Sequence, residues 1–206
     1  MIELHTYNTP NGRKVSVVLE EMGLPYSVHV VDITKDQQFK PEFLAISPNN
    51  RIPAIIDLEG PGGTPLSIFE SGAILLYLAE KTGQFMPIGL RERVPVLEWL
   101  MWQMGGFGPM LGQVHHFLTV NGDDQRYGLA RYSKEAQRLY GVLDRRLAQV
   151  EYVAGALSIA DFAILSWAWR HERHQVNLDE FPNAKRWYET LMTRPAVQRG
   201  FSISLS

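Results

Sequence analysis

The sequence predicts a small α/β domain followed by an all-helical domain. The first observation is the order of patterns before residue 82, where strand-like and helix-like segments follow one another as β-α-β and then β-β-α. The second observation is a change of pattern after Pro87, where strand signals fade and long helical patterns take over. We therefore place a boundary near residues 82–90 and divide the chain into residues 1–86 and residues 87–206.

The first three elements form a strand-helix-strand unit. Residues 2–7 alternate between apolar and polar types, which predicts a strand, and residues 26–31 predict a second one. Between them, the turn-forming residues 8–12 precede a helical pattern that stops at Gly23. Two strands joined through a helix normally pair in parallel, so we expect a parallel pair here.

The rest of the first domain predicts a hairpin and a closing helix. The polar stretch 32–50 is expected to be mostly loop, with a short helix near residues 41–45. A Gly-Pro-Gly-Gly turn then joins two strands, and a helix follows: the strands cover residues 52–58, interrupted by Pro53, and 65–69, and the helix runs from Ser71 to just before Gly83.

The second domain is expected to contain only helices. Four stretches repeat apolar residues at helical spacing, and their first apolar positions are Leu97, Ala136, Ile159 and Trp187. Pro109 and the glycines around it are expected to bend the first of these helical stretches. Ser158 and Asp161 form a capping box that opens the third stretch, and we expect its role to be structural.

Composition argues against several functional classes. The net charge is −2 and no basic stripe is present, so the footprint of a nucleic-acid-binding protein is missing. The strongest apolar run, residues 73–79, is far shorter than the ~20 residues needed to cross a bilayer. The first residues lack the basic start and apolar run of a secretory signal. We therefore expect a cytoplasmic protein without nucleic-acid or membrane partners.

The sequence contains no cysteine. This excludes disulfide bonds, thiolate metal sites and a cysteine nucleophile in the chain. Any thiol chemistry must therefore use a thiol that is brought in as a ligand. A metal site is also not expected, because the adjacent His115 and His116 diverge on a helix, and no carboxylate stands at i+4 spacing to pair with His171 or His174.

Thr9 and Asn11 lie between the first strand and the first helix. A hydroxyl and an amide at the positive end of a helix could donate hydrogen bonds to a ligand thiolate. Bringing a thiol pKa from about 8.5 to neutrality needs roughly 1.4–2.8 kcal/mol, which one or two such bonds and a helix dipole can supply. The alternative is that Thr-Pro-Asn-Gly forms a turn without any function.

Pro53 stands inside a strand pattern, where it cannot donate to the hydrogen-bond ladder. A cis peptide bond before Pro53 would turn the backbone of Ile52 outward, available to an extended peptide. An edge strand that begins at Pro53 explains the pattern equally well. Spacing alone does not decide between these interpretations.

Glu70 and Ser71 lie where the fourth strand meets its helix. Ser71 offers backbone N–H groups and a hydroxyl to a carboxylate, while Glu70 could hold an ammonium group. Together they suit the α-amino acid end of a ligand. An isolated Glu-Ser pair is also explained by plain helix capping.

Taken together, these signals resemble the glutathione transferase superfamily over the whole chain. The segments most similar to its bacterial Nu class, and to a yeast prion regulator with a related domain, are Thr9-Pro-Asn-Gly12, Gln38-Phe39, Ser47-Pro-Asn-Asn-Arg-Ile-Pro-Ala54, Phe69-Glu-Ser-Gly-Ala-Ile-Leu-Leu-Tyr-Leu-Ala79 and the stretch from Trp99 to His116. The resemblance implies a thioredoxin-like first domain and a helical-bundle second domain.

The resemblance also implies a role for each matching position. Thr9 and Asn11 would contact the glutathione sulfur. The remaining positions would bind the rest of glutathione: the Ile52 backbone with cis Pro53 at the cysteinyl unit, Glu70 and Ser71 at the γ-glutamyl end, Gln38 and Arg51 near the glycyl end, and Arg131 from the helical domain.

The function implied by the resemblance is glutathione-dependent reduction of small disulfides, with weaker conjugating or peroxidase activity. Glutathione, reduced or as its disulfide, would be the cosubstrate, no metal would be needed, and the protein would form a homodimer. A glutathione-binding regulatory or assembly module without catalysis is the alternative. The natural acceptor cannot be read from generic apolar residues.

Overall fold

A four-stranded mixed sheet lies at the centre of the first unit, with the strand order β2-β1-β3-β4. Its strands are β1 (Ile2–Thr6), β2 (Tyr26–Val30), β3 (Ala54–Asp57) and β4 (Leu66–Phe69). β1 pairs in parallel with β2 and antiparallel with β3, and β3 pairs antiparallel with β4. The predicted parallel pair and hairpin are therefore confirmed. The structure is a computed structural model that describes residues 1–204, apart from the side chains of residues 123 and 124.

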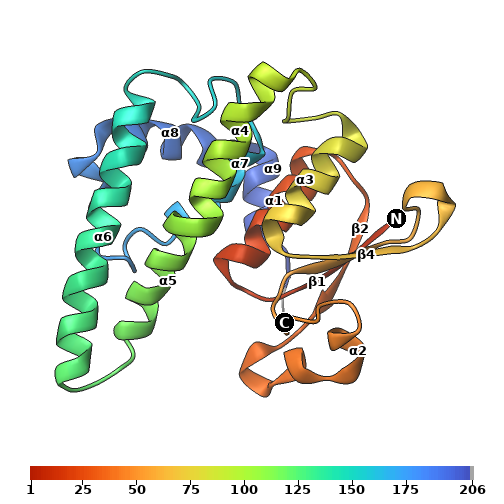
Figure 1. The fold of residues 1–206 in the computed structure, drawn as a ribbon, viewed down its shortest axis with the longest axis horizontal. Coiled ribbons are helices and arrows are strands. Elements are labelled where there is room, and N and C mark those ends of the chain that lie inside the picture. The colour runs from red at the N-terminus through yellow and green to blue at the C-terminus, as the bar shows by residue number, and fades with distance from the viewer. Residues whose placement is uncertain (205–206) are drawn as a thin grey trace. The chain divides into compact units, whose positions relative to one another are not determined.

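Helices cover the sheet because the side chains of each strand point alternately to its two faces. On β1, Ile2, Leu4 and Thr6 are buried toward α1 (Pro10–Glu21), while the intervening residues face the other side. α3 (Ser71–Thr82) packs beside α1, and the short α2 (Pro41–Leu44) covers part of the opposite face, as Figure 1 shows. Gly23 and Gly83 follow α1 and α3 with positive φ, as expected of helix stops.

The position of β3 decides one of the open alternatives. This strand begins at Ala54, after Pro53, and lies between β1 and β4. The interpretation of an edge strand beginning at Pro53 is therefore wrong. The Ile52–Pro53 peptide bond is cis.

The C-terminal segment belongs to the first unit. Two compact units are formed by residues 1–84 with 193–206, and by residues 85–192. α9 (Pro195–Ser202) packs on α1, where the Ser16 hydroxyl donates to the Gly200 carbonyl at 2.7 Å and Arg194 pairs with Glu21 at 2.6 Å. The predicted domain division at residues 86 and 87 stays a prediction, and these units differ from it mainly in the placement of this segment.

The second unit is helical in the part of the chain that the structure describes. It contains α4 (Leu90–Trp102), a π-helix (Gln103–Phe107), α5 (Gly108–Phe117), α6 (Asp123–Leu147), α7 (Ile159–Ala168), a 3-10 helix (Leu178–Glu180) and α8 (Pro182–Met192). The π-helix stands just before the predicted bend at Pro109. Across the described residues, no helix has the length and hydropathy needed to cross a membrane.

α7 is the core helix of the second unit, and all ten of its residues are buried. The predicted capping box at Ser158 and Asp161 is confirmed. The Asp161 carboxylate accepts hydrogen bonds at 3.0 Å from the Val153 and Ser158 backbone, the Ser158 hydroxyl and the Trp187 indole. These bonds tie the start of α7 to the preceding loop and to α8.

Candidate active site

One end of the sheet gathers three of the predicted site segments. His5, next to the end of β1, pairs with Ala54 at the start of β3, and Ala54 pairs with Phe69 at the end of β4. β3 runs antiparallel to both β1 and β4. The residues that follow β1, precede β3 and follow β4 therefore all leave the sheet at the same end of the strands. Thr9, Ile52 and Glu70 lie in those three connections.

Thr9 is the N-cap of α1. Its hydroxyl oxygen accepts a hydrogen bond from the Gly12 backbone N–H at 3.1 Å, and its backbone is extended. The hydroxyl hydrogen takes no part in that bond and can be donated to a ligand. The first turn of α1, which includes the half-buried Asn11, contains no acidic residue, so the positive end of the helix dipole is not offset there. This arrangement favours an anion.

Gly12 holds the start of α1 close to the end of β1. A Cβ atom at this position would lie 2.4 Å from both the Thr6 hydroxyl and the Tyr7 carbonyl oxygen. Only glycine allows this approach without moving the backbone. The position of Thr9 relative to the sheet therefore depends on Gly12.

The segment before β3 presents an unpaired piece of backbone. The Ser47 hydroxyl donates to the Arg51 carbonyl at 2.8 Å, which holds the loop that leads to Ile52. Within residues 1–204, no hydrogen bond uses the backbone N–H or C=O of Ile52. These groups can pair with an extended ligand backbone.

Glu70 and Ser71 form the start of α3. Glu70 is the N-cap and has φ 68° and ψ 114°, a conformation that costs of order 1–3 kcal/mol in a residue with a side chain. Its exposed carboxylate accepts a hydrogen bond from the Asn49 amide at 3.4 Å. Ser71 is buried in the first turn of the helix. A strained residue that holds an exposed carboxylate next to a buried hydroxyl is typical of a binding site.

Lys14 is a part of this group that the sequence analysis did not identify. This lysine of α1 is 1% exposed, and its ammonium group donates to the Ser71 hydroxyl at 3.2 Å. Burial lowers the pKa of Lys14 to about 7, while the nearby Glu70 carboxylate opposes that shift. The signal that could have identified Lys14 from the sequence is its position within an apolar helical pattern. A lysine buried in such a helix needs polar partners, which makes it a candidate site residue.

Gln38 and Arg51 lie in the loops around the same unit. Gln38 belongs to a 3-10 helix (Gln37–Phe39), and its side-chain oxygen is buried. Arg51 is exposed in the loop before β3. Neither side chain makes a hydrogen bond to another residue within 1–204. Arg131 is an exposed residue of α6 in the second unit, and its role toward a ligand stays a prediction.

Family models match both parts of the chain. The model of the glutathione S-transferase N-terminal domain matches residues 9–81, and the model of the C-terminal domain matches residues 108–195. A disulfide-bond oxidoreductase of Escherichia coli K12, YfcG, is 50% identical over 199 residues that cover 96% of this chain and 93% of the relative. The chain belongs to the glutathione S-transferase family.

Solved structures of the glutathione S-transferase family agree with this assignment. A glutathione transferase from Pseudomonas putida, with one glutathione disulfide bound per subunit, has a TM-score of 0.93 and 47% identity, covering 98% of this chain and 91% of that one. A family member from Pseudomonas fluorescens with two glutathione molecules bound also has a TM-score of 0.93, at 46% identity, with 98% and 93% covered. The expected thioredoxin-like domain followed by a helical domain is confirmed, and the protein is an enzyme of the glutathione transferase-like oxidoreductase type.

Proposed function

We propose that this protein is a glutathione-dependent disulfide-bond reductase in which the glutathione thiolate is the reacting sulfur. The observation that carries the proposal is that the capped start of α1 and the Glu70–Ser71 start of α3 lie at one edge of the sheet. The chain has no cysteine, so glutathione must supply the attacking sulfur. The name of the Escherichia coli relative and the glutathione disulfide in the Pseudomonas putida structure support the proposal.

The start of α1 is the proposed thiolate site. Thr9 and Asn11 donate hydrogen bonds to the glutathione sulfur, and the uncompensated helix dipole adds to their effect. Hydrogen bonds to a charged acceptor are stronger than those to a neutral one, so these donors favour the thiolate over the thiol. The thiolate is the nucleophile of disulfide exchange.

The rest of glutathione is proposed to bind along the same edge. The Ile52 backbone beside Pro53 pairs with the cysteinyl unit, while Ser71 holds the γ-glutamyl carboxylate and Glu70 holds its ammonium group. Gln38 and Arg51 are proposed to approach the glycyl end, and Arg131 is proposed to reach the ligand from the helical unit.

Lys14 is proposed to support this binding from beneath. Its ammonium group holds the Ser71 hydroxyl and supplies a buried positive charge next to the proposed carboxylate position. A ligand carboxylate would stabilise the charged form of Lys14, which burial disfavours in the unliganded protein.

The reaction consists of two exchanges. One glutathione thiolate attacks a sulfur of the substrate disulfide, forming a mixed disulfide and releasing the first product thiolate, which takes up a proton. A second glutathione thiolate attacks the glutathione sulfur of the mixed disulfide and releases the second product thiolate. Two glutathione molecules are oxidised to one glutathione disulfide, and the substrate disulfide is reduced to two thiols.

The test compares turnover with binding in the Thr9→Ala/Asn11→Ala double variant. Reduction of bis(2-hydroxyethyl) disulfide by glutathione should fall about 100-fold, while calorimetric affinity for glutathione disulfide should change less than fivefold, because the thiolate donors act mainly on the reacting sulfur. Thr64→Ala, in the exposed β3–β4 turn, is the matched control and should leave both values unchanged.

Equal losses of turnover and affinity in the double variant would argue against a thiolate role for Thr9 and Asn11. Glutathione binding without disulfide turnover in the unmodified protein would favour the second candidate, a non-catalytic regulatory or assembly module. The unbonded Ile52 backbone and the Glu70–Ser71 site alone would suffice for such a module. A cytoplasmic homodimer is part of our proposal, and light scattering that gives the mass of one chain would contradict the dimer.

A further inference from the structure

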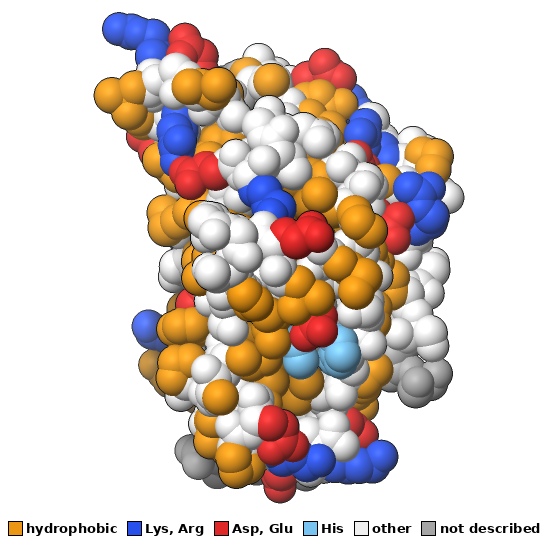
Figure 2. All heavy atoms as spheres, turned by 90° about the vertical axis from the view of Figure 1, so that its right-hand side faces the viewer, with side chains coloured by type: hydrophobic (Ala, Val, Ile, Leu, Met, Phe, Trp, Pro, Cys, Tyr) orange, Lys and Arg blue, Asp and Glu red, His pale blue; other side chains and the backbone are white. Residues whose placement is uncertain are grey.

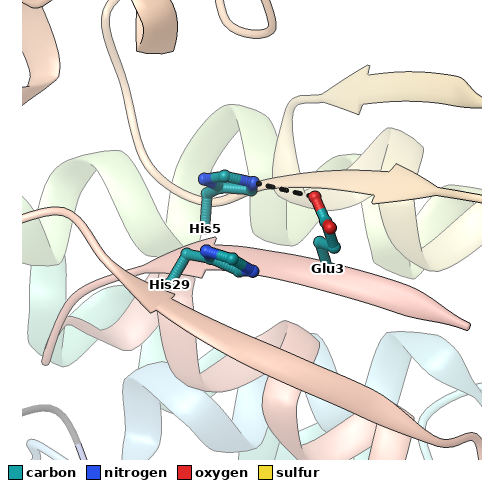
Figure 3. A group of neighbouring side chains, drawn as sticks. All are labelled: Glu3, His5 and His29. Atoms are coloured by element: carbon teal, nitrogen blue, oxygen red, sulfur yellow. Dashed lines mark ion pairs between the residues drawn. The ribbon is translucent and has the colours of Figure 1, made fainter.

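Three metal-binding side chains gather on the sheet face opposite α1. Glu3 and His5 occupy alternate positions of β1, so they share the face that Ile2 and Leu4 do not. His29 of β2 pairs directly with His5 in the parallel register. Figure 3 shows the three side chains grouped beside the two strands, and Figure 2 shows histidine and acidic side chains adjoining one another on a largely hydrophobic face.

The group is tightly arranged. The His5 and His29 rings stack with centroids 4.7 Å apart and an interplanar angle of 15°. Glu3 Oε2 lies 3.8 Å from His5 Nε2, the contact dashed in Figure 3. One ligand atom from each side chain lies within 4.8 Å of the others. Adjacent ligands of a tetrahedral zinc ion are about 3.3 Å apart, and an imidazole binds the ion in the plane of its ring. The His5 and His29 rings would therefore turn out of their parallel stack to point at one ion.

The environment of His5 suits a metal ligand. His5 Nε2 is buried and has no hydrogen-bond partner among residues 1–204, because the Glu3 oxygen is beyond hydrogen-bond distance.

The neighbours of the group leave it accessible. His29 is exposed, and its Nε2 atom lies 3.3 Å from the Ser27 hydroxyl, a weak contact that a metal bond can replace. A cavity of about 230 Å³ adjoins the two histidines, and Lys40 and Glu42, both exposed, supply opposite charges to its lining. One side of the group is therefore open to an ion and to water.

We propose that Glu3, His5 and His29 form a Zn²⁺ site with water as the fourth ligand. Two imidazoles and one carboxylate are a common ligand set for zinc with an open position. The ion would join β1 to β2 on the face away from the α1 start, so this site is separate from the proposed glutathione site and does not depend on it. The competing explanation is a stacked histidine pair that only packs against Phe43.

The test is zinc titration of the full chain, free of glutathione and of any histidine tag. Calorimetry should give one Zn²⁺ per chain with micromolar affinity, and Co²⁺ should give the visible absorption of a tetrahedral site. Zinc at 100 times its Kd should also raise the melting temperature, because the ion binds the folded chain. The absence of cysteine removes thiolate competition from these measurements.

Variants separate the site from adventitious binding. His29→Asn, at an exposed position, and Glu3→Gln should each weaken zinc binding at least tenfold and remove the tetrahedral Co²⁺ bands. His116→Asn, at another exposed histidine, should bind zinc as the unmodified chain does. Disulfide reduction should be the same in all three variants. Absence of saturable binding up to 100 µM zinc, or unchanged affinity in His29→Asn, would overturn the proposal.

Discussion

At the scale of single residues, Lys14 is a residue whose burial lowers the stability of the fold while its charge is proposed to favour ligand binding. Placing an ammonium group in the protein interior costs free energy, and the bond to the Ser71 hydroxyl and the nearby Glu70 carboxylate offset part of that cost. The lowered pKa of Lys14, about 7, is consistent with this balance. A ligand carboxylate beside Ser71 would further stabilise the charged form of Lys14.

We expect Lys14→Met to separate the two properties. The free energy of unfolding should be unchanged or higher, because methionine fills similar space without a charge to bury. Calorimetric affinity for glutathione should fall about tenfold, because Ser71 loses its donor and the site loses a cation. Lys35→Met, at an exposed lysine of the same unit, should change neither quantity. A variant that is clearly less stable but binds normally would contradict the assigned role.

At the scale of secondary-structure elements, the contact between α1 and α9 sets where the C-terminal segment belongs. The Arg13 guanidinium donates to the carbonyl oxygens of Gly200 and Ile203, each at 3.3 Å, and the Ser16 hydroxyl also donates to Gly200. A Cβ atom on Gly200 would lie 2.5 Å from Val17 Cα, so the two helix backbones are in direct contact. α9 therefore stabilises the helix whose start forms the proposed thiolate site.

Gly200→Ala should destabilise the protein by about 1–3 kcal/mol, because the added methyl group meets the α1 backbone and not a movable side chain. Denaturant unfolding measures this change. Gly141→Ala is the control, since a Cβ there would meet nothing closer than 3.4 Å and alanine favours a helix by up to about 1 kcal/mol. A neutral Gly200→Ala variant would show that α1 and α9 are not held as described.

At the scale of whole folded units, a half-buried and a buried histidine make stability depend on pH. In the second unit, His115 and His174 stack 4.7 Å apart, and the Tyr140 hydroxyl contacts His174 Nδ1 at 3.2 Å. Burial lowers the pKa of His115 to about 4 and that of His174 to about 2, and Arg170 and Arg173 add to both shifts. Both imidazoles are therefore neutral in the folded protein near neutral pH.

The sign of the pH effect follows from proton binding. Between pH 6.5 and about pH 4 the unfolded chain binds protons at both histidines and the folded chain does not, so stability falls as pH falls. Each histidine contributes up to about 1.4 kcal/mol per pH unit. Asp161 acts in the opposite direction, because burial raises its pKa to about 6 and the folded state takes up that proton first.

We expect the free energy of unfolding to decrease from pH 6.5 to pH 4.5 in denaturant titrations. Its slope against pH should be smaller than the uptake of two protons on unfolding would give. His115→Phe should lower the slope by up to one proton, because the phenylalanine ring can stack on Trp167 without titrating. His116→Asn should keep the slope of the unmodified protein, since its side chain is exposed. The same slope in His115→Phe would exclude His115 as a source of acid sensitivity.

Local patterns in the sequence determined most of the elements and the motifs. The strands and the longer helices of residues 1–84, the stop at Gly23 and the capping box at Ser158 all depend on neighbours within a few residues, so spacing alone predicts them. Composition also determined one chemical point, because a chain without cysteine can carry out thiol chemistry only with the sulfur of a ligand.

Contacts between distant segments were decided only by the tertiary structure. The place of β3 between β1 and β4, the bond between Lys14 and Ser71, the packing of Gly200 on Val17 and the grouping of Glu3 with His5 and His29 all join residues far apart in sequence or on different strands. Such contacts depend on which buried faces and polar groups find partners in the folded chain. The periodicity of one segment shows which of its faces is buried, but not which distant segment packs against that face.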